Sequence, residues 1–335
     1  MIVDRIILLS YNNTKSIEGW KIKMGKQRHC PTGILGFPVA PLKENGELDL
    51  KGLEANIEFL LENGLQSVFV ACGAGELHAL NKDEYKSMVE TAIKQVDGRV
   101  PVYTGVGGNI QHALEQAEIS TDLGADGYLI LPPYLIDPSQ DGLFNYLKAI
   151  IESTDLNAIV YQRDNCILTK ETLLALCELP QLVGFKDGIG NMEFNTEAVQ
   201  LIGDRLEWIN GMPLAEVTMA TYYNLGYRTY SSAISNYIPH ISAKYFEALK
   251  QGDLKTVHDL HTDVILPIHS IRKRKKGYAV SLIKAGMNIV GLPVGTTVRP
   301  PIAPVEQAHY DELKEILTAA NEKYPSEKAA QVEVS

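Results

Sequence analysis

The stretch Leu182-Val183-Gly184-Phe185-Lys186-Asp187-Gly188 is a short apolar run that ends in charged and turn-forming residues. Such a run is typical of a strand buried on both faces of a parallel sheet. A lysine at its end is unusual, because an apolar environment disfavours the ammonium form and lowers the pKa of the amine. The neutral Lys186 amine could then attack a carbonyl carbon and form a Schiff base. The alternative is an exposed lysine just past the strand end.

Similar runs recur along the chain and predict a closed α/β barrel. Runs rich in Val, Ile, Tyr and Phe alternate with amphipathic stretches of helical period and begin roughly 23 to 34 residues apart. Eight units of that length fit a (β/α)₈ TIM barrel. The predicted strands are residues 33–39, 67–72, 100–104, 127–131, 158–161, 183–186, 206–209 and 229–232.

Helix signals lie between and after these strands. Residues 50–61, 82–96 and 110–123 each follow an Asp or Asn, which caps helix N-termini, and each precedes a glycine. Further helices are expected at residues 238–250, 254–269, 277–290 and 305–320. Because a barrel does not need these last helices, we expect them to pack on its flank or partly cover one mouth.

We therefore divide the chain into four parts: an N-terminal extension (1–32), the barrel (33–250), a C-terminal helical extension packed on the barrel (251–321) and a tail (322–335). The extension is basic and matches no repeat unit. It is either an arm or a segment preceding an alternative start at Met24.

Composition narrows the class of protein. The chain has 335 residues and a net charge of −10, which argues against nucleic acid as the main partner. No uninterrupted apolar stretch approaches the roughly 18 residues of a membrane span, and no signal peptide is recognisable. We expect a cytoplasmic protein that acts on a small molecule.

Metal binding is not predicted. The four cysteines, Cys30, Cys72, Cys166 and Cys177, form no CxxC pair. They are expected to be reduced and mostly buried. His258 and His261 are three residues apart, whereas zinc-binding helices more often space two histidines by four and need a further ligand.

In a TIM barrel the active site lies at the C-terminal ends of the strands. The second strand ends in Cys72-Gly73-Ala74-Gly75-Glu76, where small residues allow backbone N–H groups to approach a carboxylate. The alternative is a simple tight turn. The third strand is followed by Gly105-Val106-Gly107-Gly108-Asn109, a second glycine-rich turn that matches a phosphate loop only weakly.

The fifth strand ends in the polar cluster Tyr161-Gln162-Arg163-Asp164-Asn165. Neighbouring parallel strands lie about 4.8 Å apart, so Tyr161 and Lys186 could share one pocket. The phenol could then move protons while Arg163 binds an anionic group. The alternative for Arg163 is an internal ion pair with Asp164.

The last two strands contribute Asn210-Gly211-Met212-Pro213 and Ser231-Ser232-Ala233 to the same mouth. Residues 272–276 are a basic run, which we interpret as a solvated helix junction. The predicted catalytic residues are Lys186 and Tyr161. The predicted substrate-binding residues are Gly73, Ala74, Gly75, Arg163, Asn165, Gly211, Ser231 and Ser232.

Several separated motifs make the chain resemble the dihydrodipicolinate synthase and N-acetylneuraminate lyase superfamily of Schiff-base (β/α)₈ enzymes. They are Tyr161-Gln162-Arg163-Asp164-Asn165, Gly184-Phe185-Lys186-Asp187-Gly188-Ile189-Gly190, Tyr230-Ser231-Ser232-Ala233 with Ile238-Pro239, Gly277-Tyr278-Ala279-Val280-Ser281 with Lys284-Ala285-Gly286, and Val298-Arg299-Pro300-Pro301. The chain is most similar to the branch that dehydrates and decarboxylates 5-dehydro-4-deoxyglucarate, a 2-keto-3-deoxy diacid. In the synthase and lyase branches a proline-containing turn usually follows the strand-five tyrosine.

The resemblance implies that Lys186 forms the Schiff base, that Tyr161 handles protons, that no other cofactor is needed, and that the protein is a homotetramer built as a dimer of dimers. One departure concerns the second strand. The superfamily usually has a threonine in this turn, whereas this chain has Gly73-Ala74-Gly75-Glu76. An aldolase or synthase acting on another 2-keto acid therefore stays open, as does an impaired barrel that only binds keto acids.

Overall fold

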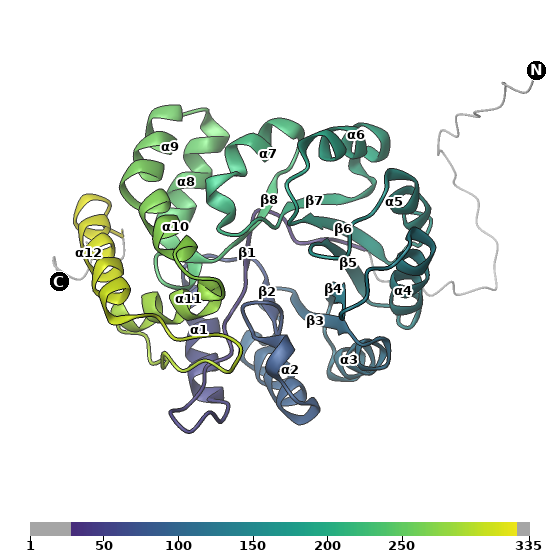
Figure 1. Cartoon of the computed structure of the whole chain (residues 1–335), viewed down its shortest axis with the longest axis horizontal. Coiled ribbons are helices and arrows are strands. Elements are labelled where there is room, and N and C mark those ends of the chain that lie inside the picture. The colour runs from purple at the N-terminus through teal and green to yellow at the C-terminus, as the bar shows by residue number, and fades with distance from the viewer. Residues whose placement is uncertain (1–27, 327–335) are drawn as a thin grey trace, which may run out of the picture.

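The computed structural model describes residues 28–326. Eight parallel strands close into a barrel in chain order, with β1 paired to both β2 and β8. Helices surround the barrel (Figure 1), which confirms the predicted fold class. Residues 1–27 of the predicted N-terminal extension and residues 327–335 of the predicted tail lie outside the described residues. The strands are β1 Ile34–Gly36, β2 Val68–Val70, β3 Val102–Gly108, β4 Gly127–Pro133, β5 Asn157–Gln162, β6 Leu182–Asp187, β7 Glu207–Asn210 and β8 Thr229–Ser232.

The glycine-rich segment at residues 105–108 is part of strand β3, so the predicted turn was wrong. The strand pairs with β4 as far as Gly108, opposite Pro133. A Cβ on Gly105 would lie 2.2 Å from the carbonyl oxygen of Ala71. Glycine is therefore required here because the backbone after β2 passes close to β3.

The helices predicted to begin at residues 50, 82 and 110 do so, because the expected caps form. The Asp49 carboxylate accepts a hydrogen bond from the backbone N–H of Gly52, and Asn81 forms a reciprocal capping box with Glu84. The helices are α1 Leu50–Glu62, α2 Lys82–Val96, α3 Ile110–Leu123, α4 Gln140–Glu152, α5 Lys170–Leu176, α6 Met192–Ile202, α7 Met219–Leu225, α8 Pro239–Gln251, α9 Leu254–Leu260, α10 Leu266–Lys273, α11 Tyr278–Ile289 and α12 Gln307–Lys323.

The helix predicted at residues 254–269 is interrupted. A π-helical turn at His261–Ile265 separates α9 from α10. Pro267 stands in the first turn of α10, where its missing N–H breaks the α-helical hydrogen-bond series. The break lets α10 start as a separate helix.

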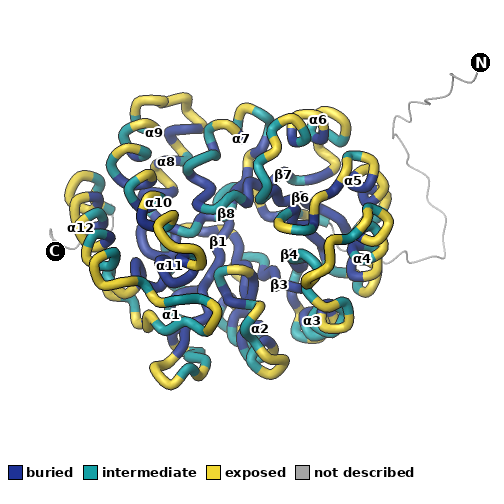
Figure 2. Tube along the Cα trace, viewed as in Figure 1, coloured by how far each residue is buried: buried dark blue, intermediate teal, exposed yellow. Residues whose placement is uncertain are grey.

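The core has an inner and an outer layer. Inside the barrel, Phe37 stacks on Phe69 with ring centroids 4.7 Å apart, and Phe69 stacks on Tyr103 at 5.0 Å. A larger outer layer lies between the strands and the helices. Figure 2 shows buried strands at the centre and helices with exposed outer faces. No helix in residues 28–326 is long and apolar enough to cross a membrane.

A buried ion pair joins the C-terminal helices to the barrel. The Lys284 ammonium of α11 lies 2.5 Å from a Glu76 carboxylate oxygen, and their side chains are 0% and 1% exposed. Lys284 also donates to the Thr297 carbonyl, while Glu76 accepts from the Arg299 backbone N–H. Glu76 ends the turn that carries Ala74, so α11 holds this turn in place.

Removing one partner should therefore cost far more stability than removing both. We expect Lys284→Met alone to lower the free energy of unfolding by about 3–5 kcal/mol, since it leaves a buried carboxylate unpaired. The double variant Glu76→Leu/Lys284→Met should lose less than Lys284→Met. Urea unfolding midpoints at fixed protein concentration measure both. Equal losses in the single and double variants would show that the pair does not couple these elements.

Candidate active site

A cavity of about 240 Å³ opens at the C-terminal ends of the strands and contains most of the predicted site residues. Lys186 and Tyr161 both line it. Its other lining residues are Phe37, Gly73, Ala74, Leu129, Arg163, Gly211, Met212, Pro213, Leu214, Ser231, Ser232, Ala233, Arg272, Ala279, Val280 and Ile283. The last three belong to α11, so a C-terminal helix forms part of the wall, as expected of a segment that partly covers the mouth.

Lys186 is buried among aromatic and apolar groups. It is 5% exposed, and its amine lies 3.9 Å from the Tyr161 ring centroid and 4.8 Å from that of Phe37. Burial lowers the pKa of the amine below its ordinary value. Cys72 is close enough to interact electrostatically with this amine, and burial raises the pKa of that thiol to about 12, so it supplies no negative charge. The structure therefore places Lys186 inside the barrel and excludes the exposed alternative.

The neighbouring carboxylate of Asp187 does not neutralise this amine. Successive residues of a strand face opposite sides of the sheet, so Asp187 faces the outer layer. There its oxygens accept hydrogen bonds from the Tyr222 hydroxyl at 2.5 Å and the Asn195 amide at 2.7 Å. No carboxylate within residues 28–326 pairs with Lys186, which favours the nucleophilic neutral amine.

Tyr161 stands directly opposite Lys186 in the β5–β6 register. Its hydroxyl donates to the Gly211 carbonyl at 2.8 Å and accepts from the Arg163 guanidinium at 3.1 Å. Burial alone would raise the pKa of the phenol, but the positive charges of Lys186 and Arg163 together lower it. An acidified phenol beside the amine is suited to transfer protons during Schiff-base chemistry.

Glycines create the space in which these two side chains meet. A Cβ on Gly211 would lie 2.6 Å from Cγ of Lys186 and 2.8 Å from the Tyr161 ring. A Cβ on Gly188 would also lie 2.8 Å from the Tyr161 ring, at the same atom, Cε2. Gly211 therefore serves the site through close approach and through its carbonyl, in addition to lining the cavity.

Only two of the three substrate-binding residues predicted in the turn after β2 line the cavity. Gly73 and Ala74 line the cavity, whereas Gly75 does not. Gly75 is buried against its own turn, where a Cβ would lie 2.8 Å from Cα of Ala71. It shapes the turn rather than facing the cavity.

Both predicted serines, Ser231 and Ser232, line the cavity, but the Ser232 hydroxyl already forms hydrogen bonds within the protein. It donates to the Glu216 carboxyl at 2.5 Å and accepts from the Ser235 N–H at 3.1 Å. Burial raises the pKa of Glu216, which favours its neutral form in this site. The Ser231 hydroxyl makes no hydrogen bond with residues 28–326 and is available to a ligand.

Asn165 also lies outside the cavity. Its amide nitrogen donates to the Pro133 carbonyl at 3.0 Å and to that of Ile136. It lines a neighbouring hollow of about 900 Å³ instead. The residue ties the loop after β5 to the loop after β4, so direct substrate binding by Asn165 finds no support in its position.

Sequence reasoning missed Phe37 and Arg272. Phe37 lies within the first predicted strand, residues 33–39, and directly follows β1, so its position could have been found by extending the strand-end rule to apolar residues near the end. Arg272 comes from α10, and its run was interpreted as solvated. The structure corrects this interpretation for Arg272, which lines the cavity, while Lys273 to Lys276 are exposed. No pattern in the sequence predicts that α10 packs with Arg272 at the cavity.

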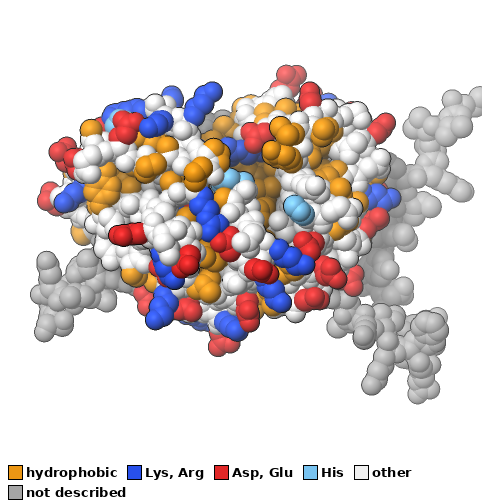
Figure 3. All heavy atoms as spheres, turned by 60° about the horizontal axis from the view of Figure 1, so that its bottom comes forward, with side chains coloured by type: hydrophobic (Ala, Val, Ile, Leu, Met, Phe, Trp, Pro, Cys, Tyr) orange, Lys and Arg blue, Asp and Glu red, His pale blue; other side chains and the backbone are white. Residues whose placement is uncertain are grey.

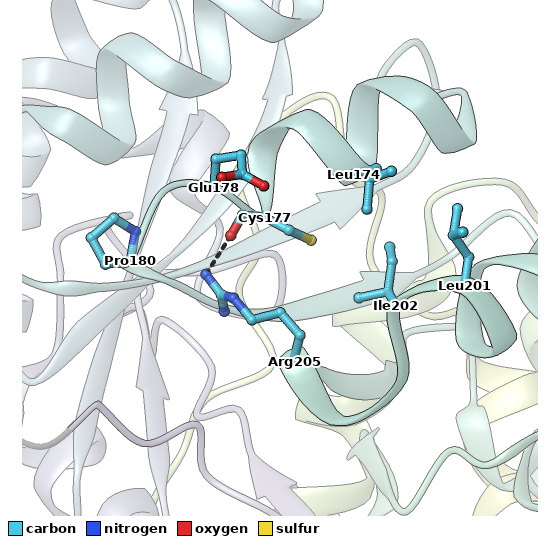
Figure 4. A pocket seen from close by; sticks show the side chains of 7 residues that line it. All are labelled: Leu174, Cys177, Glu178, Pro180, Leu201, Ile202 and Arg205. Atoms are coloured by element: carbon cyan, nitrogen blue, oxygen red, sulfur yellow. Dashed lines mark hydrogen bonds between the residues drawn. The ribbon is translucent and has the colours of Figure 1, made fainter. Parts of the chain in front are cut away.

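A second hollow lies at the opposite end of the barrel, between α5 and α6 (Figure 4). Its Arg205 donates to the backbone carbonyls of Cys177 and Leu182, each at 2.7 Å, and to that of Leu179 at 2.8 Å. The guanidinium is therefore used to hold loops together. Contacts at this end of a TIM barrel usually serve stability.

No metal-binding cluster of three or more His, Cys, Asp or Glu side chains occurs within residues 28–326. A ring nitrogen of His261 lies 2.9 Å from the Glu216 carbonyl oxygen. This side chain therefore helps to pack the π-helical turn after α9 against the barrel. The four cysteines are free. On the face shown in Figure 3, acidic and basic side chains are interspersed.

The fold and the site define a (β/α)₈ protein with a buried strand-six lysine beside a strand-five tyrosine. The dihydrodipicolinate synthetase family model matches residues 30–320. The chain belongs to this family.

The chain is similar to curated proteins named "Probable 5-dehydro-4-deoxyglucarate dehydratase". The Bacillus subtilis protein is 57% identical over 306 residues, 91% of this chain and 99% of the relative. The Oceanobacillus iheyensis protein is 56% identical over 89% of this chain and 97% of the relative. Among solved structures, dihydrodipicolinate synthase from Oceanobacillus iheyensis superposes with a TM-score of 0.80 at 30% identity, covering 87% of this chain and 96% of the other.

The electrostatics of the site predict a pH effect. Schiff-base formation needs the neutral amine, so trapping should rise with pH through the Lys186 pKa. Arg163 lowers that pKa by charge repulsion. Arg163→Met should therefore move the inflection of the trapping rate to higher pH, measured with a 2-keto acid and cyanoborohydride. Arg163→Lys, which keeps the charge, is the control and should stay closer to the wild type. A shift to lower pH would contradict this electrostatic account.

Proposed function

We propose that this chain is a Schiff-base-forming lyase that converts 5-dehydro-4-deoxy-D-glucarate to 2,5-dioxopentanoate, carbon dioxide and water. The observation that carries the Schiff-base chemistry is the buried Lys186 amine, which lies 3.9 Å from the Tyr161 ring centroid and is paired with no carboxylate of the described residues. The substrate is taken from relatives that are 56–58% identical over about nine-tenths of the chain and carry this name.

The first stage joins the amine to the substrate. The Lys186 nitrogen attacks the keto carbon, and the carbonyl oxygen leaves as water after receiving protons, with Tyr161 as the nearby donor. The product is an iminium, in which the nitrogen draws electrons from the adjacent methylene. That methylene then loses a proton to Tyr161 or to water and forms an enamine.

The second stage removes two groups. The enamine electrons expel the β-hydroxyl as water, leaving a carbon–carbon double bond conjugated with the iminium. The bond to the far carboxylate then breaks, and its electron pair moves through this conjugated system to the nitrogen, releasing carbon dioxide. Protonation and tautomerisation of the resulting enol give the aldehyde. Hydrolysis consumes the water released in the first stage and regenerates Lys186, so one water is formed overall.

Because the iminium serves as the electron sink, we propose that no separate cofactor or metal takes part. The four free cysteines fit a reducing compartment, and we propose the cytoplasm. A small keto acid, rather than nucleic acid or a membrane, is the proposed partner of the cavity, because its lining combines apolar walls with a few cationic groups.

The reaction is tested by incubating the protein with 5-dehydro-4-deoxyglucarate. We expect carbon dioxide and 2,5-dioxopentanoate in equal amounts, and borohydride reduction should attach the substrate to Lys186, as peptide mass spectrometry would detect. Lys186→Met should lack both activities because the nucleophile is gone, whereas Lys148→Met on exposed α4 should keep them. Release of pyruvate would instead indicate an aldolase. Binding without turnover or adduct would indicate the impaired barrel.

We also propose a homotetramer built as a dimer of dimers. Support comes from the loop between β4 and α4, where Tyr134, Leu135 and Ile136 are 69%, 80% and 64% exposed. Three consecutive large apolar side chains in solvent are typical of an interaction surface. They border the neighbouring hollow of about 900 Å³, which the same loop of a second copy could fill.

Disruption of this loop should reduce the size of the assembly. We expect sedimentation to give a tetramer for the wild type and smaller species for Leu135→Asp, because a buried charge would oppose association. Leu254→Asp on α9 is the matched control at an exposed leucine and should leave the tetramer intact. A tetramer that survives Leu135→Asp would show that this loop is not the interface.

A further inference from the structure

Arg272 is set apart from the other basic residues of its run. It lines the cavity that contains Lys186, although it comes from α10 outside the barrel. Arg274 instead pairs with Glu312 at 2.5 Å, and Lys275 pairs with Glu306 at 2.8 Å, both at the surface. Arg272 has no such acidic partner within residues 28–326.

The charges around Arg272 leave it uncompensated. Burial and then repulsion by Arg163 lower the pKa of its guanidinium. Within residues 28–326, the only carboxylate paired with Arg163 is that of Asp164, at 3.4 Å, and the Asp164 side chain is 74% exposed. The described cavity lining contains no acidic residue. Two guanidiniums that face one cavity without a carboxylate between them favour an anionic ligand.

We propose that Arg272, together with Arg163, binds the distal carboxylate of a 2-keto dicarboxylate and so selects a dianionic substrate. This inference rests on the proposed function and adds the residue that recognises the second acid group. The keto group would react at Lys186, while its adjacent carboxylate would lie toward the turn at Gly73 and Ala74. That turn follows β2, and β2 lies across the closed barrel from β6.

The apolar part of the lining strengthens the interaction. Ala279, Val280 and Ile283 of α11 line the same cavity as Arg272. An apolar wall limits water around the guanidinium, and ion pairing is stronger where water is excluded. The cavity lining therefore combines the small residues of the β2 turn and two guanidiniums with apolar side chains, which suits a short chain with a carboxylate at each end.

The position of Arg272 also has a consequence for product release. The proposed reaction removes the distal carboxylate as uncharged carbon dioxide. The remaining aldehyde no longer offers an anion to Arg272 and Arg163. The two guanidiniums that favour binding of the dianion thus have no carboxylate to bind in the monoanionic product. The affinity for the product is therefore lower than that for the substrate.

The test compares two keto acids of equal chain length, 2-oxoglutarate with two carboxylates and 2-oxopentanoate with one. Dissociation constants are measured by calorimetry on the full-length protein. Arg272→Met should raise the constant for 2-oxoglutarate by about tenfold to a hundredfold, the loss expected for a charged hydrogen bond. It should change that for 2-oxopentanoate by less than about threefold. Retained monoacid binding shows that the variant has folded.

Two further variants sharpen the result. Lys273→Met removes the adjacent charge, which is exposed outside the cavity, and should leave both constants near the wild-type values. Arg272→Lys keeps a cation and should recover part of the dianion preference. Equal effects of Arg272→Met on both keto acids, or none on either, would overturn the role of Arg272. Failure of the wild type to form a borohydride adduct with either acid would instead overturn the Schiff-base function.

Discussion

The chemistry of the site depends on the burial of one nitrogen atom, the Lys186 amine, which has no carboxylate partner in the part of the chain that the structure describes. Burial of a charge is unfavourable unless the charge is paired, so the neutral form gains relative to the ammonium. The alternation of the β6 strand supplies this condition. It directs Lys186 into the barrel and Asp187 outward, where Tyr222 and Asn195 bind its oxygens. One strand therefore places adjacent residues of opposite charge in separate environments.

Glycines let the backbone come close enough to enforce this arrangement. Gly211 packs against Lys186 and Tyr161, and Gly188 packs against the tyrosine ring. Because a Cβ at either position would meet these side chains below 3.0 Å, the pair has little room to move. The amine and phenol are thus held in one geometry before a substrate arrives, which is the kind of preorganisation that favours catalysis.

Periodicity and strand-end position predicted much of this architecture. Asp49 and Asn81 cap the helices as expected, and the registered pair of Tyr161 and Lys186 follows from counting adjacent strands. These features depend on local sequence and on the regular order of a parallel barrel. They therefore leave a signal in the chain itself, independent of any contact between distant segments.

The features that were missed arise from contacts between distant segments. The strand character of Gly105 depends on Ala71 passing beside it, and the engagement of Asn165 depends on the loop after β4. Likewise, the Ser232 hydroxyl is not free because it donates a hydrogen bond to Glu216 in a buried network. Residue type and strand-end position alone do not distinguish a polar side chain that faces a ligand from one that satisfies a neighbour.

The C-terminal helices contribute to substrate specificity. Lys284 of α11 pairs with Glu76 and so fixes the turn that carries Ala74, while α10 brings Arg272 to the other part of the cavity. The barrel itself supplies the Lys186 and Tyr161 chemistry. Elements added after the eighth strand can thus change which keto acid fits without altering the nucleophile. On this view the alanine in the β2 turn need not impair the site, because substrate recognition is shared with a guanidinium pair that lies elsewhere in the same cavity.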